Sequence, residues 1–333
     1  MNRRYLLNGL SLFFLVVISS CTSKPDEKST VDTIIKEDNG LQISLAQWSL
    51  HKTFFGGPVE DWDRFGRLIK TYPDSLLQGE DPMNFPKMAA DYGVNTIELV
   101  NVFYYGKAND KAYWEEFKNK CKDAGVSVGL IMCDRLGNLG DPDSLARAQA
   151  VKNHHIWVDI AEFLGASAIR VNAAGKGTEE EVAASAEAGL KSLANYASSK
   201  NINVIVENHG GYSSNGKWLA GVIDKVGLEN VGTLPDFGNF CLKRGDGGCI
   251  REYDRYQGMA EIMPFAKGVS AKSHEFDLDG NEVHTDFTKM IEIVKQASFS
   301  GYIGIEFEGN DLSEDEGIKA TKALLEKVLE SNS

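Results

Sequence analysis

The feature that most constrains the fold is a regular alternation of short apolar runs with longer amphipathic stretches. A parallel pair of strands needs a long crossover between its members, so this alternation predicts parallel pairing with right-handed crossovers. Eight strand–helix units in about 270 residues predict an α/β fold, a single (β/α)8 barrel. The expected strands are Ile43–Trp48, Thr96–Val100, Ser127–Met132, Ala168–Asn172, Asn203–Glu207, Val231–Pro235, Gly268–Lys272 and Tyr302–Glu306.

The amphipathic stretches supply the expected helices. The stretch from Thr53 to Pro86 is too long for one connection, so we expect an extra helix around Asp61–Thr71 before the regular first helix near Pro86–Tyr92. A doubly wound open sheet is the competing fold, but its Gly-rich fingerprint does not follow Ile43–Trp48. The other expected helices are Lys111–Ala124, Ser144–Leu164, Glu179–Ser199, Phe287–Ala297 and Ser313–Leu329.

The N-terminal segment is expected to be a targeting signal. Two arginines precede an apolar run from Leu10 to Ile18, which is too short and too early for a membrane-spanning helix. Small residues then lead directly to Cys21, as in a bacterial lipoprotein signal peptide over residues 1–20. We therefore expect lipidation at Cys21 and export to the cell envelope, with the lipid as the only membrane anchor. An ordinary signal peptide with an incidental cysteine is the alternative.

The polar segment over residues 21–40 is predicted to be a flexible tether, and residues 41–330 are predicted to form the barrel. The formal charge of −13 disfavours a nucleic-acid partner, because phosphate binding needs a basic surface. Cys241 and Cys249 flank a glycine-containing stretch, and in an oxidising compartment a disulfide and two free thiols both stay open for them. No C-x-x-C pair exists to form a zinc ribbon or a thioredoxin-type motif.

Acidic and imidazole side chains gather at the ends of the last four expected strands. These residues are Glu207, Asp236, His274 and Glu306. Because such barrels build their sites at the carboxyl ends of the strands, we expect the four side chains to converge. Three carboxylates and one imidazole suit a divalent cation such as Mn, Mg, Co or Zn. Any one of them alone could be a helix cap or a solvated loop residue, but four successive strands favour a site.

Further polar and aromatic side chains are expected at the same mouth. Lys272 precedes His274 by two residues and so shares its face of the strand. Its ammonium is expected either to hold a substrate oxygen or to pair with Glu207 or Glu306. The candidate substrate-binding residues are Trp48, His51, Glu98, Arg170, Asn172, His209 and Lys272.

Four short segments carry a family resemblance: Val-Glu-Asn-His, Leu-Pro-Asp-Phe-Gly-Asn, Ala-Lys-Ser-His and Gly-Ile-Glu-Phe-Glu-Gly. Together they resemble the xylose-isomerase-like TIM-barrel superfamily, and especially its sugar phosphate isomerase/epimerase branch. The resemblance implies that Glu207, Asp236, His274 and Glu306 bind one divalent metal, and that the two glutamates form an acid/base pair. Apurinic endonucleases share the barrel but place a histidine three residues after the aspartate, where this chain has Asn239.

The resemblance implies a divalent-metal-dependent sugar isomerase or epimerase. One glutamate would remove a proton alpha to a carbonyl, and the metal, with Lys272 or Arg170, would hold the resulting enediolate. A metal-dependent lyase acting on 3-keto-glycosides is the first alternative, because an exported protein should rarely meet sugar phosphates. A non-catalytic glycan-binding barrel is the second. The expected partner is a small-molecule sugar, while its identity, the metal and the oligomeric state stay open.

Overall fold

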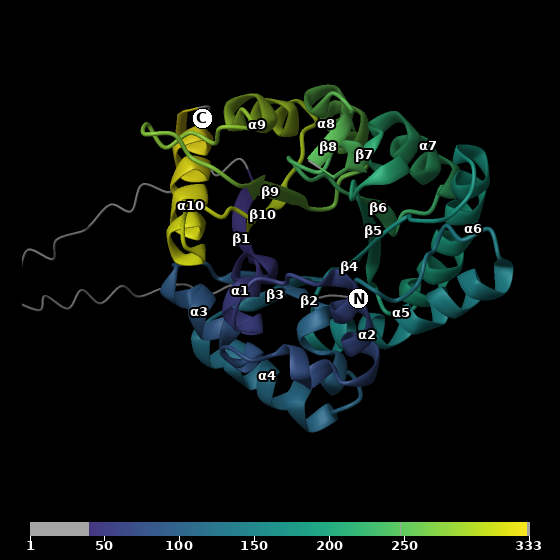
Figure 1. Cartoon of the computed structure of the whole chain (residues 1–333), viewed down its shortest axis with the longest axis horizontal. Coiled ribbons are helices and arrows are strands. Elements are labelled where there is room, and N and C mark those ends of the chain that lie inside the picture. The colour runs from purple at the N-terminus through teal and green to yellow at the C-terminus, as the bar shows by residue number, and fades with distance from the viewer. Residues whose placement is uncertain (1–39, 247, 332–333) are drawn as a thin grey trace, which may run out of the picture. The chain divides into compact units, whose positions relative to one another are not determined.

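Eight parallel strands form the barrel in the computed structural model, which describes residues 40–246 and 248–331. The sheet order is β6-β5-β4-β3-β2-β1-β10-β9, and isolated bridges from Thr233 to Ala266 and from Asp236 to Ser270 bring its two edges together (Figure 1). The prediction of a single (β/α)8 barrel is therefore confirmed. The strands are β1 (Leu41–Ala46), β2 (Thr96–Val100), β3 (Ser127–Met132), β4 (Ala168–Val171), β5 (Asn203–Glu207), β6 (Val231–Leu234), β9 (Val269–Ser273) and β10 (Gly301–Phe307).

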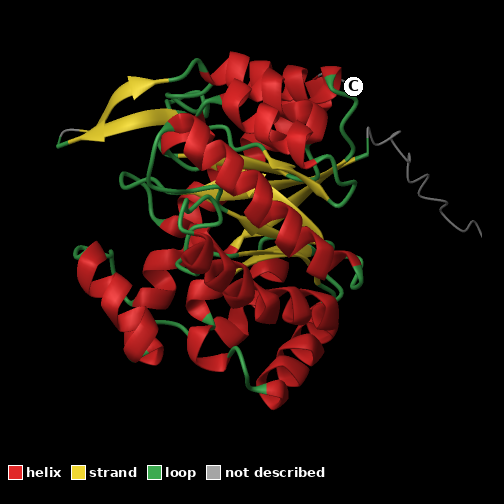
Figure 2. Ribbon diagram, turned by 90° about the vertical axis from the view of Figure 1, so that its right-hand side faces the viewer, coloured by secondary structure: helices red, strands yellow, loops and turns green. Residues whose placement is uncertain are grey.

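Helices cover the outside of the sheet (Figure 2). The sequence fixes their ends locally: Asp143 accepts hydrogen bonds from the first turn of α5, and Thr178 and Glu181 form a capping box on α6. Left-handed glycines, such as Gly125 and Gly165, end α4 and α5. The helices are α3 (Phe85–Asp91), α4 (Lys111–Ala124), α5 (Ser144–Leu164), α6 (Glu179–Ser198), α7 (Gly216–Val226), α8 (Arg255–Ile262), α9 (Phe287–Gln296) and α10 (Glu314–Ser331).

The connection after β1 differs from the expectation at its start. The first strand ends at Ala46 rather than Trp48, because Gln47–Leu50 turns into a 3-10 helix that continues as α1 (His51–Phe55). The expected extra helix is present as α2 (Trp62–Thr71). Its first turn is capped by Asp61, whose carboxylate accepts a 2.7 Å hydrogen bond from the backbone of Arg64.

A two-stranded antiparallel hairpin lies between β6 and α8 and was not expected from the sequence. It consists of β7 (Cys241–Gly245) and β8 (Gly248–Glu252) and projects from the barrel (Figure 2). A disulfide between Cys241 and Cys249 joins its two strands, which decides between the two possibilities left open by the sequence. Its exposed, polar strands lack the apolar pattern that marks the barrel strands.

The targeting prediction falls on residues 1–39 and lies outside the described residues. Cys21 and the tether therefore stay predictions. Within the part of the chain that the structure describes, no helix has the length and apolar character needed to cross a membrane.

Thiol mapping checks the cysteine arrangement. Cys121 and Cys133 are free and buried, and burial raises the pKa of the Cys121 thiol to about 12. Since thiolate is the reactive form, we expect an alkylating reagent to label neither thiol until denaturant is added. Unreduced peptide maps should contain the Cys241–Cys249 linkage. Alkylation of Cys241 or Cys249 in native, unreduced protein would contradict the disulfide.

Candidate active site

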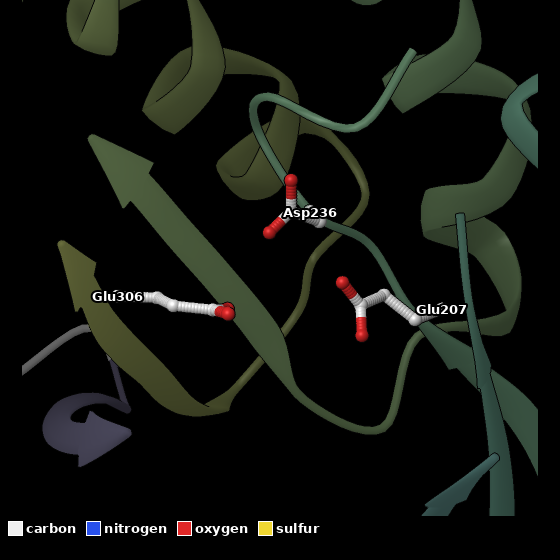
Figure 3. Close-up of side chains that lie close together, drawn as sticks. All are labelled: Glu207, Asp236 and Glu306. Carbon is white, nitrogen blue, oxygen red and sulfur yellow. The ribbon is translucent and has the colours of Figure 1, made fainter. Parts of the chain in front are cut away.

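Three buried carboxylates meet at the carboxyl end of the barrel. Glu207 ends β5, Asp236 lies two residues beyond β6, and Glu306 lies in β10. One carboxylate oxygen from each lies within 4.8 Å of the other two, and all three side chains point toward a common centre (Figure 3). None is more than 3% exposed. The structure thus brings three of the expected site residues together, and a group of this kind can hold a metal ion.

The strand register explains which residues stand between these carboxylates. Lys272 of β9 pairs with Glu306 of β10, and Ser270 pairs with Asp236. Alternate residues of a strand share a face, so Ser270 and Lys272 both enter the same space. The Ser270 hydroxyl oxygen lies 2.8 Å from Asp236 Oδ2 and 2.6 Å from Glu306 Oε2.

The Ser270 hydroxyl has one hydrogen for two carboxyl groups. A serine has a single hydroxyl hydrogen, so it donates to one carboxylate and accepts a hydrogen bond from the other. Burial and the negative charges of Glu207 and Glu306 raise the pKa of Asp236, although Lys272 acts in the opposite sense. Burial therefore favours the protonated form of Asp236 in the folded chain.

The ammonium of Lys272 lies among the carboxylates. Its Nζ is 3.3 Å from Glu306 Oε1, 3.5 Å from Glu308 Oε2 and 3.7 Å from Asp236 Oδ2. The side chain is 2% exposed, so this charge is screened little by solvent. Burial opposes ionisation of Glu308, but Lys272 together with the nearby histidines outweighs it and lowers the pKa of Glu308 to about 2.

Arg170 supplies the second buried cation, on the opposite side of the group. Its Nε lies 2.8 Å from Glu207 Oε2, and its Nη1 donates a 2.8 Å hydrogen bond to Asp134 Oδ1. Asn172 donates to the same Asp134 oxygen at 2.9 Å. Burial raises the pKa of Glu207, with Arg170 acting in the opposite sense. Arg170 thus forms an ion pair with Glu207, as Lys272 does with Glu306.

The loop after β6 orients the remaining carboxylate oxygens. The backbone N–H groups of Gly238 and Asn239 both donate to Asp236 Oδ1 at 2.8 Å. The side-chain amide of Asn239 donates to Glu207 Oε1, also at 2.8 Å. Asn239 was noticed in the sequence only as a departure from a histidine. Its hydrogen bond shows that it positions Glu207.

A cavity of about 350 Å3 opens beside Glu306 and Lys272. Five of the seven expected substrate-binding residues line it, together with Glu306 and Glu308. The five are Trp48, Arg170, Asn172, His209 and Lys272. The other polar and aromatic lining residues were not among the expected site residues and come from connecting loops, α2 and the hairpin strand β7: Trp62, Phe65, Asp134, Arg135, Asn239 and Arg244.

Three expected site residues lie elsewhere. His274 follows the end of β9; its backbone N–H donates to Glu282, and its ring lies 6.2 Å from that of His284, so the structure does not group it with the three carboxylates. His51 lies in α1 and stacks on Trp48 at 4.9 Å. Glu98 is buried in β2 and, like His51, does not line the cavity.

The donor set does not match the expected four-ligand metal site. Carboxylate and hydroxyl oxygens suit a hard divalent cation. However, Ser270 occupies the space between Asp236 and Glu306, and the ammonium of Lys272 lies within ion-pair distance of both. A divalent cation in this space would be repelled by that ammonium at short range in a buried setting. The residues as arranged therefore do not fit a resident metal ion.

The chain belongs to the xylose isomerase-like TIM barrel family, whose model matches residues 86–328. This assignment agrees with the resemblance seen in the sequence segments at the strand ends. No curated protein sequence matches the chain.

Solved structures show the same fold. A xylose isomerase-like TIM barrel protein from Mycobacterium smegmatis in complex with magnesium is 17% identical, with a TM-score of 0.62, and the match covers 87% of this chain and 97% of that one. The 3-keto-D-glucoside 4-epimerase from E. coli is 16% identical, with a TM-score of 0.60 and coverages of 74% and 95%. The IOLI protein with a bound zinc atom is 11% identical, with a TM-score of 0.60 and coverages of 87% and 98%.

Replacing Glu98 by glutamine tests the burial of charge beneath the site. Glu98 is 1% exposed, accepts a 2.6 Å hydrogen bond from Ser44, and burial raises its pKa to about 7. The folded carboxyl therefore binds a proton more tightly than the unfolded one, so its stabilisation is lost as the pH rises toward and above about 7. We expect Glu98→Gln to increase the free energy of unfolding by about 2 kcal/mol more at pH ~8 than at pH ~5.5.

Urea unfolding at the two pH values measures this difference. Glu292→Gln, on the exposed face of α9, is the matched control and should change stability equally at both. An equal effect of Glu98→Gln at the two pH values would show that Glu98 is ionised normally.

Proposed function

We propose that this chain is a sugar isomerase or epimerase that moves a proton at the carbon alpha to a carbonyl, with Glu207 and Glu306 as the acid/base pair. The observation that carries the proposal is the placement of two buried glutamates, on β5 and β10, in one group of carboxylates, each beside its own cation. Glu306 also lines the cavity. Two glutamates on different strands can address different faces of one substrate carbon. Membership in the family and the epimerase among its structural neighbours support this reading.

The proton transfers follow from the charges around the two glutamates. The glutamate that is ionised takes the proton from the substrate carbon, and the electron pair left behind forms an enediolate. A raised pKa in Glu207 makes this group a stronger base than an exposed carboxylate. Return of a proton to the opposite face gives an epimer, and return to the neighbouring carbon gives an isomer.

The expected divalent metal bears on this proposal in one respect. A bound cation would polarise the substrate carbonyl and stabilise the enediolate, and neighbours that contain magnesium or zinc support that expectation. The position of Lys272 speaks against it in this chain. The steps above therefore use only the side chains of this protein.

The same enediolate leads to the alternative activity. If the substrate carries a leaving group beta to the carbonyl, as a 3-keto-glycoside does, expulsion of that group gives a lyase. The 3-keto-D-glucoside 4-epimerase among the structural neighbours favours keto-glycosides as a substrate class to test. Product analysis separates the activities, because only the lyase releases an aglycone. A glycan-binding barrel without catalysis would show neither exchange nor release.

Deuterium exchange tests the assigned glutamates. In D2O the wild-type chain should introduce deuterium alpha to the carbonyl of at least one member of a panel of free ketoses and 3-keto-glucosides, as measured by NMR. Because glutamine cannot transfer the proton, Glu306→Gln and Glu207→Gln should each lower that rate by about 100-fold or more. Glu292→Gln is the surface control. Wild-type exchange rates in Glu306→Gln would remove Glu306 from the proposed pair.

We further propose that the protein is an exported lipoprotein modified at Cys21. The proposal rests on the apolar run from Leu10 to Ile18 and on the small residues before Cys21. In a bacterial host, the wild-type chain should incorporate labelled palmitate and fractionate with membranes, and Cys21→Ala should abolish the label. Labelling of Cys21→Ala would place the lipid elsewhere, and an unlabelled wild type would favour an ordinary signal peptide.

A further inference from the structure

We infer that the ammonium of Lys272 takes the place of a divalent cation in this barrel, so that the chain binds its substrate oxygen and stabilises the enediolate without a metal ion. The inference rests on the proposed function for its chemistry. Its structural basis is independent, because it depends on what Ser270 and Lys272 occupy.

Ser270 removes one corner of a metal site. It lies on β9 between Asp236 and Glu306, and its hydroxyl touches a carboxylate oxygen of each. Those two oxygens face each other across the hydroxyl and so are engaged with it. A short, neutral side chain at this position provides a weak ligand where a metal site would need a strong one.

Lys272 supplies positive charge to the carboxylate group in place of a metal ion. It lies two residues along the same face of β9, and its Nζ stands within 3.7 Å of Asp236, Glu306 and Glu308. Arg170 neutralises the remaining carboxylate, Glu207, at 2.8 Å. Each carboxylate of the group thus has a cation of the chain within 3.7 Å, and Lys272 is shared by three of them.

The surroundings of Lys272 keep its ammonium in this place. A Cβ at Gly238 would lie 3.3 Å from the Cγ and Cδ atoms of the lysine stem, so the glycine leaves room for the extended side chain. The side chain is almost fully buried, yet it is one of the residues that line the cavity. A substrate oxygen that enters the cavity therefore meets a positioned ammonium group.

This ammonium can perform the electrophilic part of the reaction. An ammonium carries three donors and a full positive charge. When a glutamate takes the proton from the substrate carbon, the C–H electron pair becomes part of a carbon–carbon double bond, and the carbonyl π pair moves onto oxygen. The lysine donates to that oxygen and balances its charge. The proton then returns from the glutamic acid to carbon, so the step needs no oxidant or reductant.

Manganese binding tests the inference without using activity. We expect the full-length wild-type chain, freed of metal by a chelator, to show no stoichiometric Mn2+ site by electron paramagnetic resonance. The double variant Ser270→His/Lys272→Ala introduces an imidazole and removes the ammonium, and should bind about one Mn2+ per chain. Adding Asp236→Ala to it should abolish that site. One Mn2+ per wild-type chain, lost in Asp236→Ala alone, would overturn the inference, as would a folded double variant that binds none.

Exchange measurements give the catalytic half of the test. Wild-type exchange should be unchanged by EDTA and by added Mn2+, and Lys272→Met should lower it by about 100-fold or more. Lys319→Met, on the exposed face of α10, is the matched control. Loss of exchange on EDTA treatment would overturn the inference. Circular dichroism checks that Lys272→Met is folded, and Lys272→Arg keeps the charge if it is not.

The two proposals fail in different ways. If the wild type exchanges no sugar proton at all, the proposed function fails while manganese binding still decides whether Lys272 excludes the cation. If exchange is present and stops with EDTA, the proton-transfer function stands and the role of Lys272 is wrong.

Discussion

Charge compensation among the buried carboxylates at the carboxyl end of the barrel is the interaction on which the site depends. Carboxylates this deeply buried would repel each other and lose their hydration, a cost that only nearby positive charge offsets. Lys272 on β9 and Arg170 on β4 provide that charge from two sides. Because both cations come from barrel strands, the site is fixed by the same backbone hydrogen bonds that close the sheet, and it does not depend on mobile loops for its charge balance.

The two cations do not neutralise all of the buried carboxylates, because Lys272 is shared by three of them. Ser270 can satisfy its two carboxylate partners only if one of them is protonated, and Glu98 beneath them also holds a proton more tightly than usual. A group of acids that shares fewer cations than it has carboxylates keeps exchangeable protons near neutral pH. That property suits the proton transfers that we propose for Glu207 and Glu306.

Most of the fold and the three carboxylates could be predicted from the sequence because they rest on patterns of period two and on the alternation of strands with helices. The sequence could not predict how far along the barrel axis each side chain lies relative to those of the neighbouring strand. Ser270 and Lys272 share one face of β9 and His274 follows the end of the strand, and nothing local in the sequence marks which of the three reaches the level of Glu306. Only the pairing of β9 with β10 sets that level, and pairing is a long-range property. The hairpin β7–β8 was not predicted because its strands bury little surface and carry no apolar pattern.

The disulfide in that hairpin has a consequence for substrate access. Arg244 lies in β7, between the two bonded cysteines, and its side chain forms part of the cavity wall. The covalent link restricts the hairpin, so the position of this guanidinium at the entrance depends on the oxidation state of two sulfur atoms. One wall of the cavity thus rests on a covalent bond that persists only in an oxidising environment.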